Sequence, residues 1–156
     1  MSFNADAFLN QTASGPLSTS VPACPEGEYR AIIDDSEKAI SFSSGTNKEG
    51  KAWHKMSVSF KILDDAVKAA LSRENVFVPM QLWLDLNADE SGMDTSEGKN
   101  VGLGRLRACL DQNDGSPWAP AMLKGKGPLM VKVTQRSDPK DPSIKYAEVS
   151  RVAKIS

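Results

Sequence analysis

Residues 50–62, with the sequence GKAWHKMSVSFKI, alternate between two kinds of side chain along almost their whole length. One set is mostly apolar and consists of His54, Met56, Val58, Phe60 and Ile62. The other set is polar and basic apart from one tryptophan, and consists of Trp53, Lys55, Ser57, Ser59 and Lys61. Because successive side chains of a strand point to opposite faces of a sheet, this pattern predicts a half-buried β-strand with the apolar set in the core. A tryptophan on the wet face of that strand needs an explanation.

Four further segments are predicted to be strands from alternation and from the turn residues that bound them. They are residues 26–35 (EGEYRAIIDD), 76–86 (VFVPMQLWLDL), 129–136 (LMVKVTQR) and 144–155 (IKYAEVSRVAKI). Residues 43–51 (SSGTNKEGK) are rich in turn-forming residues and are predicted to be a loop that leads into the opening strand. The chain is therefore predicted to contain five strands.

Two helices are predicted between these strands. Residues 64–75 contain helix-forming residues behind an Asp that can cap them, and residues 101–112 place leucines at helical spacing before Asn113 to Gly115 end the helix. Residues 1–25 lack periodicity and are rich in small and polar residues, which indicates an extended, mobile N-terminal arm with a short helix around Ala5 to Leu9.

The fold class expected from this order is β-dominated. Five contiguous strands with short turns favour a curled antiparallel sheet over a βαβ arrangement, and a sheet of this length curls readily into an OB-like barrel with one helix before the penultimate strand. The expected organisation is an extended arm at residues 1–25 and a single OB-like domain at residues 26–156.

Composition is that of an ordinary globular chain of 156 residues with a net charge of −1. That total hides an asymmetry, because residues 63–100 carry three basic and eight acidic side chains whereas residues 101–156 carry ten and five. There is no apolar run of the roughly 20 residues that a membrane span needs and no pattern of a secretory signal. Cys24 and Cys109 form no metal or redox motif. A cytoplasmic protein is expected.

Aromatic and basic side chains share the predicted outward faces of the strands. Rings interleaved with cations suit a single-stranded nucleic acid, because bases stack on the rings while Lys and Arg contact phosphates. The residues predicted to bind nucleic acid are Trp53, Trp83, Phe77, Lys51, Lys55, Lys61, Lys132 and Arg136. The alternative is structural: the aromatic rings are buried under the arm or a helix, Phe77 beneath residues 101–112, and the lysines are plain solvated surface.

The order of elements also resembles a known family. The resemblance extends over about residues 22–156 and rests on three motifs. They are EGEYRAIIDD with Gly27 and Tyr29, VGLGRLRACL, and LKGKGPLMVKVTQR with Leu123, Gly125 and Lys126. This looks like a family of small phage-encoded proteins, formerly of unknown function, that bind single-stranded DNA through an OB fold. The resemblance implies roles in phage DNA replication and recombination, in the cytoplasm of the host cell. The chain ends in RVAKIS, so the acidic partner-recruiting tail of many such proteins is not expected.

The sequence contains no convincing motif for a catalytic or metal-binding site. His54 lies on the predicted inward face, as a core or rim histidine without a catalytic partner. Asp85, Asn87 and Asp89 have the spacing of a calcium loop, but Glu90 stands where that loop needs Gly and Ser96 where it needs Glu. No enzyme activity, metal or cofactor is therefore expected.

The expected function is non-catalytic, largely sequence-independent binding of single-stranded DNA by base stacking and phosphate contacts. The alternative is a protein–protein or virion assembly module that uses the same aromatic residues as interface anchors. The choice between DNA and RNA, the oligomeric state, the site size and the partners remain open at this level, and self-association and cooperative coating of a strand stay among the expectations.

Overall fold

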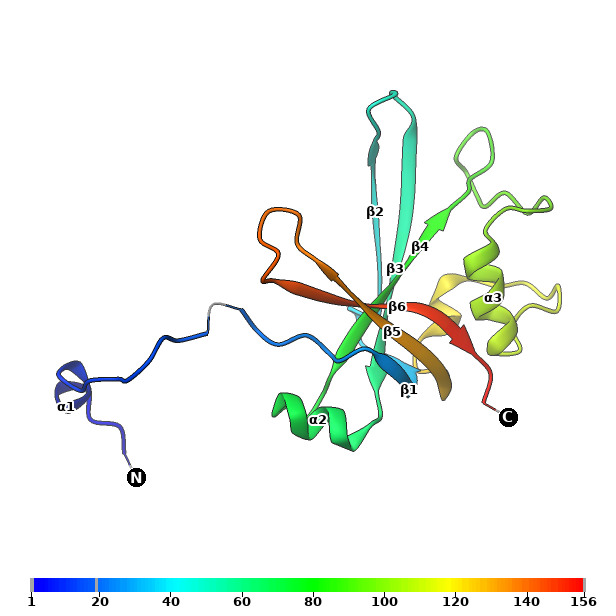
Figure 1. Ribbon diagram of the computed structural model, residues 1–156. Helices are drawn as coiled ribbons and strands as arrows, with labels where there is room; N and C mark the ends of the chain where they lie inside the picture. Colours follow the sequence, from blue (N-terminus) through cyan, green and yellow to red (C-terminus); the bar gives the residue numbers. More distant parts are fainter. Residues whose placement is uncertain (1, 19, 156) are drawn as a thin grey trace.

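The computed structural model describes residues 2–18 and 20–155, and Figure 1 shows a β-sheet body with an N-terminal arm extending away from it. The strands are β1 (Gly27–Ile33), β2 (Ile40–Thr46), β3 (Ala52–Ile62), β4 (Phe77–Leu84), β5 (Leu129–Ser137) and β6 (Lys145–Ala153). The helices are α1 (Ala5–Leu9), α2 (Asp65–Leu71) and α3 (Val101–Cys109), with a short 3₁₀ turn η1 at Pro120–Leu123. The predicted β-dominated class is confirmed.

All of these strands belong to one antiparallel sheet. The hydrogen-bonded order is β2-β3-β1-β5-β6, and β4 pairs with the other edge of β3. β3 is long enough to pair with β2 through its first half and with β1 through its last three residues, while β4 runs along most of its opposite edge. β4 also lies against β6. In the part of the chain that the structure describes, however, no ladder joins β4 to β6, so the sheet is open.

The core lies on the face that the alternation predicted. Met56, Val58, Phe60 and Ile62 of β3 are fully buried. They pack with apolar side chains from β1, β4, β5, β6 and the inner side of α3, namely Ala31, Ile33, Val78, Met80, Leu82, Leu103, Leu106, Val131, Val133 and Val149. Burial of this continuous apolar set is the main free-energy gain that holds the curled sheet together.

The predicted number of strands was wrong by one, because Ile40–Thr46 forms β2 where residues 43–51 were expected to be a loop. Its sequence, ISFSSGT, is mostly small and exposed, and such a segment carries little local strand signal. β2 is held by pairing with β3 in the register Ile40↔Val58 to Thr46↔Ala52. The turn that joins the two strands is tied by Asn47, whose side chain accepts hydrogen bonds from the backbone N–H groups of Glu49 and Lys51.

The helices form close to where they were predicted. α2 is capped by Asp64, whose carboxylate accepts a 3.0 Å hydrogen bond from the Val67 N–H group. α3 precedes the penultimate strand as expected and lies against β4 and β6. It ends at Cys109 rather than at residue 112, because Asp111 has a left-handed φ of 58° that a helix does not continue through.

Asn100 fixes the start of α3 against the end of β4. Its side-chain oxygen accepts from the Asp85 N–H group at 2.8 Å, and its side-chain nitrogen donates to the carbonyls of Asp85 and Asp94. The Asn100 N–H group donates in turn to the Asp85 carboxylate at 2.8 Å. These four bonds set how α3 covers the end of the sheet.

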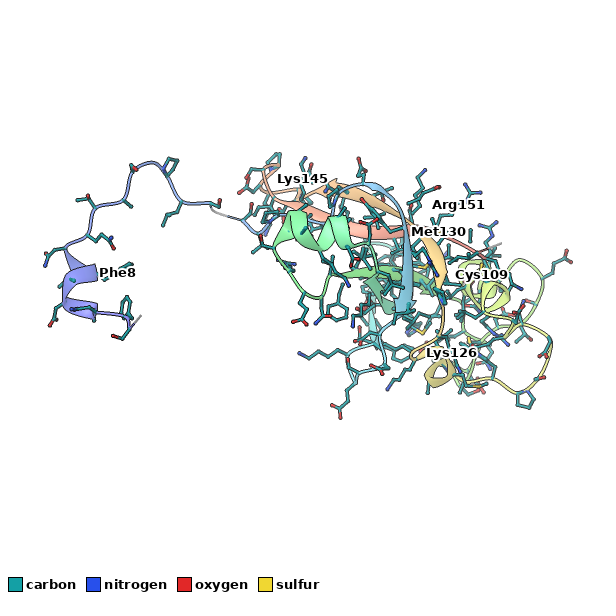
Figure 2. The ribbon with its side chains drawn as sticks, turned by 90° about the horizontal axis from the view of Figure 1, so that it is seen from below. Phe8, Cys109, Lys126, Met130, Lys145 and Arg151 are labelled. Carbon is teal, nitrogen blue, oxygen red and sulfur yellow. The ribbon has the colours of Figure 1, made fainter. Side chains whose placement is uncertain are left out.

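The N-terminal arm makes few contacts with the body before its last residues. Residues 2–18 are exposed, and α1 carries Phe8 60% exposed, well separated from the strands (Figure 2). The arm joins the body at Cys24, which is buried and whose carbonyl accepts a 2.8 Å hydrogen bond from the Gln135 side chain. No helix in the described residues is long and apolar enough to cross a membrane.

Candidate functional site

Two tryptophans and a lysine form a cluster on the outer face of the sheet, opposite the core. The rings of Trp53 and Trp83 meet edge to face, with 5.7 Å between their centroids and an angle of 79° between their planes. Lys55 and Trp83 are direct register partners on β3 and β4. The Lys55 ammonium lies 5.8 Å from the Trp53 centroid and 5.6 Å from the Trp83 centroid. Both distances fall within the range in which a cation is attracted to a ring face.

Gly45 explains why Trp53 is tolerated on the wet side of a strand. Gly45 of β2 is the register partner of Trp53, and a Cβ placed on it would lie 2.7 Å from Trp53 Cζ2. The indole therefore lies across the backbone of β2 in space that any other residue would fill. This contact buries part of the ring, and Trp53 is half-buried as a result.

Trp83 has no such cover and is 64% exposed. Trp is a residue with a large apolar surface, and exposing most of it to water forgoes a substantial gain in free energy. The expectation that a helix or the arm buries Trp83 is therefore not what the structure shows. A flat ring that is exposed, braced by a second ring and accompanied by a cation is suited to contact with a planar ligand.

The same face continues along β3 and β4 toward Phe77. The register runs from Lys55↔Trp83 through Ser57↔Gln81 and Ser59↔Pro79 to Lys61↔Phe77. Six residues of strand separate the two ends, which corresponds to about 20 Å. Phe77 is 48% exposed and lines a groove with residues of β4, the β5–β6 hairpin and the arm, so it is not buried beneath α3 as the alternative expected. The predicted residues Trp53, Lys55, Trp83, Lys61 and Phe77 thus share one strip of sheet, with aromatic rings at both ends.

A groove of about 510 Å³ opens beside Phe77, between β4 and the β5–β6 hairpin. Its lining includes Phe77, Gln81, Arg136 and Tyr146, and the last residues of the arm, 20–24, form one wall. The Arg136 guanidinium stacks on the Tyr146 ring at 5.0 Å. Arg136 also donates a hydrogen bond to the Glu148 carboxylate, and this contact is the first cause of a raised Arg136 pKa. Arg136 is therefore near the strip, but its charge is already paired.

Of the two remaining predicted lysines, Lys132 lies away from the tryptophans and Lys51 lies close to Trp53 along the chain. Lys132 lies on β5, which pairs with β1 and β6, and its register partners are Glu28 and Arg151. It lines a separate hollow with those two residues and is not brought together with the tryptophans. Lys51 is exposed at the turn between β2 and β3, one residue before Trp53's strand begins.

Three contributors to this region are absent from the set of residues predicted to bind nucleic acid. Gly45 lies in a segment that was expected to be a loop, so the sequence did not indicate that it packs beneath the Trp53 indole. Tyr146 had the signal of an aromatic residue among cations on the last strand, where its register partner is Arg136. Gln81 alternates with the aromatic residues of β4, and its Oε1 is shielded from water without a hydrogen-bond partner among the described residues.

The third tryptophan has a structural environment. Trp118 is half-buried, its Nε1 donates to the Gln112 side chain at 2.8 Å, and the Arg107 guanidinium lies 4.4 Å from its ring. Arg107 in turn donates to the Gln112 carbonyl. This group holds the segment after α3 and offers no exposed ring.

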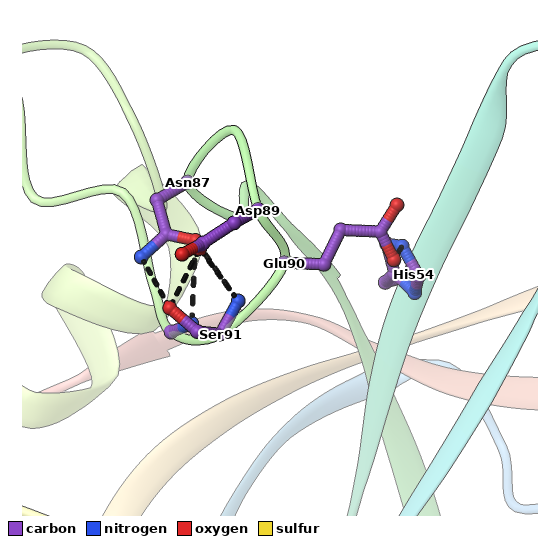
Figure 3. Close-up of polar contacts among 6 residues, drawn as sticks. His54, Asn87, Asp89, Glu90 and Ser91 are labelled. Atoms are coloured by element: carbon purple, nitrogen blue, oxygen red, sulfur yellow. Dashed lines mark hydrogen bonds and ion pairs between the residues drawn. The ribbon is translucent and has the colours of Figure 1, made fainter.

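The inner face of the β2–β3 hairpin lies beside an apolar pocket of about 410 Å³. Phe42, Met56, Leu84, Met93 and Leu103 line it. His54 stands at its rim, half-buried as the alternation predicted, with Nε2 3.4 Å from the Glu90 carboxylate (Figure 3).

In the polar loop that follows β4, the side chains of Asn87, Asp89 and Ser91 form hydrogen bonds within the loop itself. The Ser91 N–H group donates to both Asn87 Oδ1 and Asp89 Oδ1, and the Ser91 hydroxyl donates to Asp89 Oδ1 at 2.6 Å (Figure 3). The two bonds from Ser91 to Asp89, that of the hydroxyl first, lower the pKa of the Asp89 carboxyl. Across residues 2–18 and 20–155, no three His, Cys, Asp or Glu side chains are grouped so that they could hold a metal ion.

Comparisons with protein-family models, with curated proteins and with solved structures found no match to this chain.

Proposed function

We propose that this protein binds single-stranded DNA without catalysis and largely without regard to sequence. The observation that carries the proposal is the Trp53–Lys55–Trp83 cluster, in which a ring that is 64% exposed stands beside a second ring and an ammonium group on a polar sheet face. Bases of any identity stack on such rings, with about 1–3 kcal/mol lost per base when the ring is removed, and the cation contacts the phosphate between them.

The strand order supports the same proposal. With β2 set aside as an added hairpin strand, β1 pairs with β3 and β5, β3 pairs with β4, and β5 pairs with β6. A partly open OB-type barrel would have this strand connectivity, and the contact of β4 with β6 and the helix between the third and fourth of these strands support that assignment. In OB folds the face of the second and third strands binds oligonucleotides. Those strands are β3 and β4 here, and they carry both tryptophans.

The proposed path of the DNA follows the strip from Trp83 to Phe77. One base stacks on Trp83 and a neighbour on the exposed part of Trp53, while Lys55 contacts the phosphate. The backbone then passes Lys61, and a further base stacks on Phe77 at the mouth of the groove, beside Arg136 and Tyr146. The strip of about 20 Å matches roughly three to four nucleotides of extended strand, at the lower end of the range of about 4–16 nucleotides bound by an OB fold.

The charges divide into direct and indirect contributors. Lys51, Lys55 and Lys61 carry no ion pair among the described residues and lie on or beside the strip, so they are assigned to phosphates. Arg136 has to exchange Glu148 for a phosphate, which reduces its net contribution. Lys132, beside Glu28 and Arg151 on β5, is left out of the path. The biological role that we propose is protection of single strands during phage DNA replication and recombination.

The test is a titration with a fluorescent oligo-dT of about 30 nucleotides, following anisotropy and tryptophan emission together. Wild-type protein is expected to bind with quenched tryptophan emission. Three phosphate contacts predict a slope of log affinity against log salt of about −2. Trp83→Ala is expected to raise Kd by about 5- to 150-fold. Phe8→Ala, which removes a ring 60% exposed on the arm, is the matched control with no change expected.

Two outcomes contradict the proposal. If folded Trp83→Ala binds oligo-dT as tightly as the wild type, the stacking mechanism is wrong. If the wild type does not bind at low salt, the exposed rings are anchors for a protein partner instead, and a protein interface is far less sensitive to ionic strength. An oligo-U titrated in parallel decides whether DNA is preferred to RNA.

A further inference from the structure

β2 presents a strand edge that the rest of the described chain leaves uncovered. It pairs with β3 on one side only and stands at the end of the sheet order. The β2–β3 hairpin projects from the body, with β2 on its outer side (Figure 1). A strand with one free edge offers its unpaired N–H and C=O groups to any extended segment of matching shape.

The hydrogen bonds at both ends of the hairpin show which residues of β2 direct their backbone N–H and C=O groups to the free edge. The Ser59 N–H group donates to the Ala39 carbonyl at 2.8 Å, and the Asn47 N–H group donates to the Lys51 carbonyl at 2.9 Å. In an antiparallel ladder, hydrogen-bonded and non-hydrogen-bonded pairs alternate. The odd-numbered residues of β2 therefore bond to β3. The backbone groups of the even-numbered ones, Ile40, Phe42, Ser44 and Thr46, point to the free edge.

This edge lacks the features by which sheets usually avoid pairing. Natural edges carry charges, prolines or bulges. β2 reads ISFSSGT, with no charge, no proline and an unbroken register to β3. It also carries Phe42, which is 61% exposed. An exposed ring on an unprotected edge is surface that a partner strand would bury.

We propose that the partner is a second copy of this chain, joined through antiparallel β2–β2 pairing about a two-fold axis at Ser43. In that register Phe42 lies opposite the partner's Ser44, and Ile40 lies opposite the partner's Thr46. The four residues of each strand whose backbone groups point to the free edge then pair with residues of the partner strand. This pairing gives about eight backbone hydrogen bonds. A seven-residue strand centred on its own middle residue is self-complementary, as a two-fold interface requires.

Side chains agree with this register. Phe42 and the partner's Phe42 become diagonal neighbours on the inner face, at about 7–8 Å between backbones, which is within reach of two aromatic rings. On the outer face only Ser41, Ser43 and Gly45 approach the axis from each copy, and none of them is bulky or charged. The interface therefore gains an aromatic contact and meets no charge repulsion from the paired strands themselves.

One consequence rests on the proposed function. The two-fold axis runs perpendicular to the sheet, so the outer faces of both copies form one continuous surface in the order β4-β3-β2 and then β2-β3-β4 of the partner. Two Trp53–Lys55–Trp83 clusters would then lie on the same side of the dimer. Longer oligonucleotides would bind more tightly than short ones by engaging both clusters, whereas dimerisation itself needs no DNA.

The sharpest test is disulfide trapping without DNA. At the axis, Ser43 faces the partner's Ser43 as a non-hydrogen-bonded pair, with about 4.5 Å between Cα atoms, which is inside the range of about 4.4–6.8 Å for a disulfide. Ser43→Cys is therefore expected to form a covalent dimer under mild oxidation. Ser41→Cys is the control, because its two copies are offset by four residues, about 13 Å, and should not cross-link. Wild-type protein measures any background from Cys24 and Cys109.

A second pair of variants tests the backbone edge by sedimentation velocity over a range of concentrations. Ser44→Pro removes an N–H group that points only to the free edge and leaves the ladder with β3 intact, so the dimer Kd should rise at least about tenfold. Ser44→Ala keeps that N–H group and should dimerise like the wild type. A wild type that stays monomeric at high concentration, or a folded Ser43→Cys that forms no dimer, would overturn the proposal whether or not the protein binds DNA.

Discussion

Replacing Gly45 with alanine is expected to displace Trp53 and to weaken both the fold and the proposed binding of DNA, although Gly45 itself contacts no ligand in the proposed path. The added Cβ would lie 2.7 Å from Trp53 Cζ2, 2.9 Å from Cε2 and 3.1 Å from Nε1. Carbon atoms in contact are about 3.5–4.0 Å apart, so the indole has to shift by about 1 Å or rotate away.

The magnitude follows from the contacts that hold the ring. An edge-to-face aromatic pair contributes about 0.5–1.5 kcal/mol, and an exposed cation–π contact about 0.5–1 kcal/mol. Alanine restores about 0.4–1 kcal/mol through the lower entropy of the unfolded chain. The free energy of unfolding should therefore fall by about 1 kcal/mol. Kd for oligo-dT should rise about 5- to 10-fold, because the Trp53 stacking surface is displaced while Trp83 remains in place.

Urea denaturation followed by tryptophan emission measures the first quantity, and oligo-dT anisotropy measures the second. Gly104→Ala is the matched control, since Gly104 lies in α3 with no atom within 4 Å of an added Cβ. That variant should be more stable by about 0.5–1 kcal/mol and should bind normally. If Gly45→Ala matches the wild type in stability, in near-ultraviolet circular dichroism and in affinity, the Trp53 indole does not depend on the space that Gly45 leaves, and the prediction is wrong.

Three further predictions concern the stability of the fold and the reactivity of its thiols. Asn100→Ala removes the three side-chain hydrogen bonds between α3 and the end of β4 and should lower the free energy of unfolding by about 2–4 kcal/mol in chemical denaturation. Asp64→Ala removes the cap of α2 and should cost about 1 kcal/mol in the same assay, whereas Asp65→Ala, which caps nothing, should cost less. Burial, followed by the charge of Asp64, raises the pKa of the Cys24 thiol to about 11. The unfolded chain therefore loses this proton first, so stability should fall as pH rises from about 9 to 11, and at pH 8 a thiol reagent should modify Cys109 far faster than Cys24.

The alternating segments were predictable because their information is local. Val58 and Phe60 must share a face whatever β3 pairs with, and the same holds for Val78 and Leu82 on β4, since side-chain period is a property of the extended backbone. Asp64 likewise indicates a helix from its own place in the chain. The β-dominated class, the helix before the penultimate strand and the aromatic–basic character of the outer face therefore follow from the amino-acid sequence alone.

Pairing and register could be decided only by the tertiary structure. ISFSSGT carries little local strand signal and becomes β2 because β3 offers it a hydrogen-bonding edge. Lys55 lies between two rings because β3 and β4 pair in one register, and a shift by one residue would turn Trp83 to the other face. Lys132 and Arg136 alternate identically on β5, yet only Arg136 lies near the aromatic strip, because the curvature of the sheet brings the β5–β6 hairpin beside Phe77. Local sequence sets which side chains share a face, and long-range packing sets which faces meet.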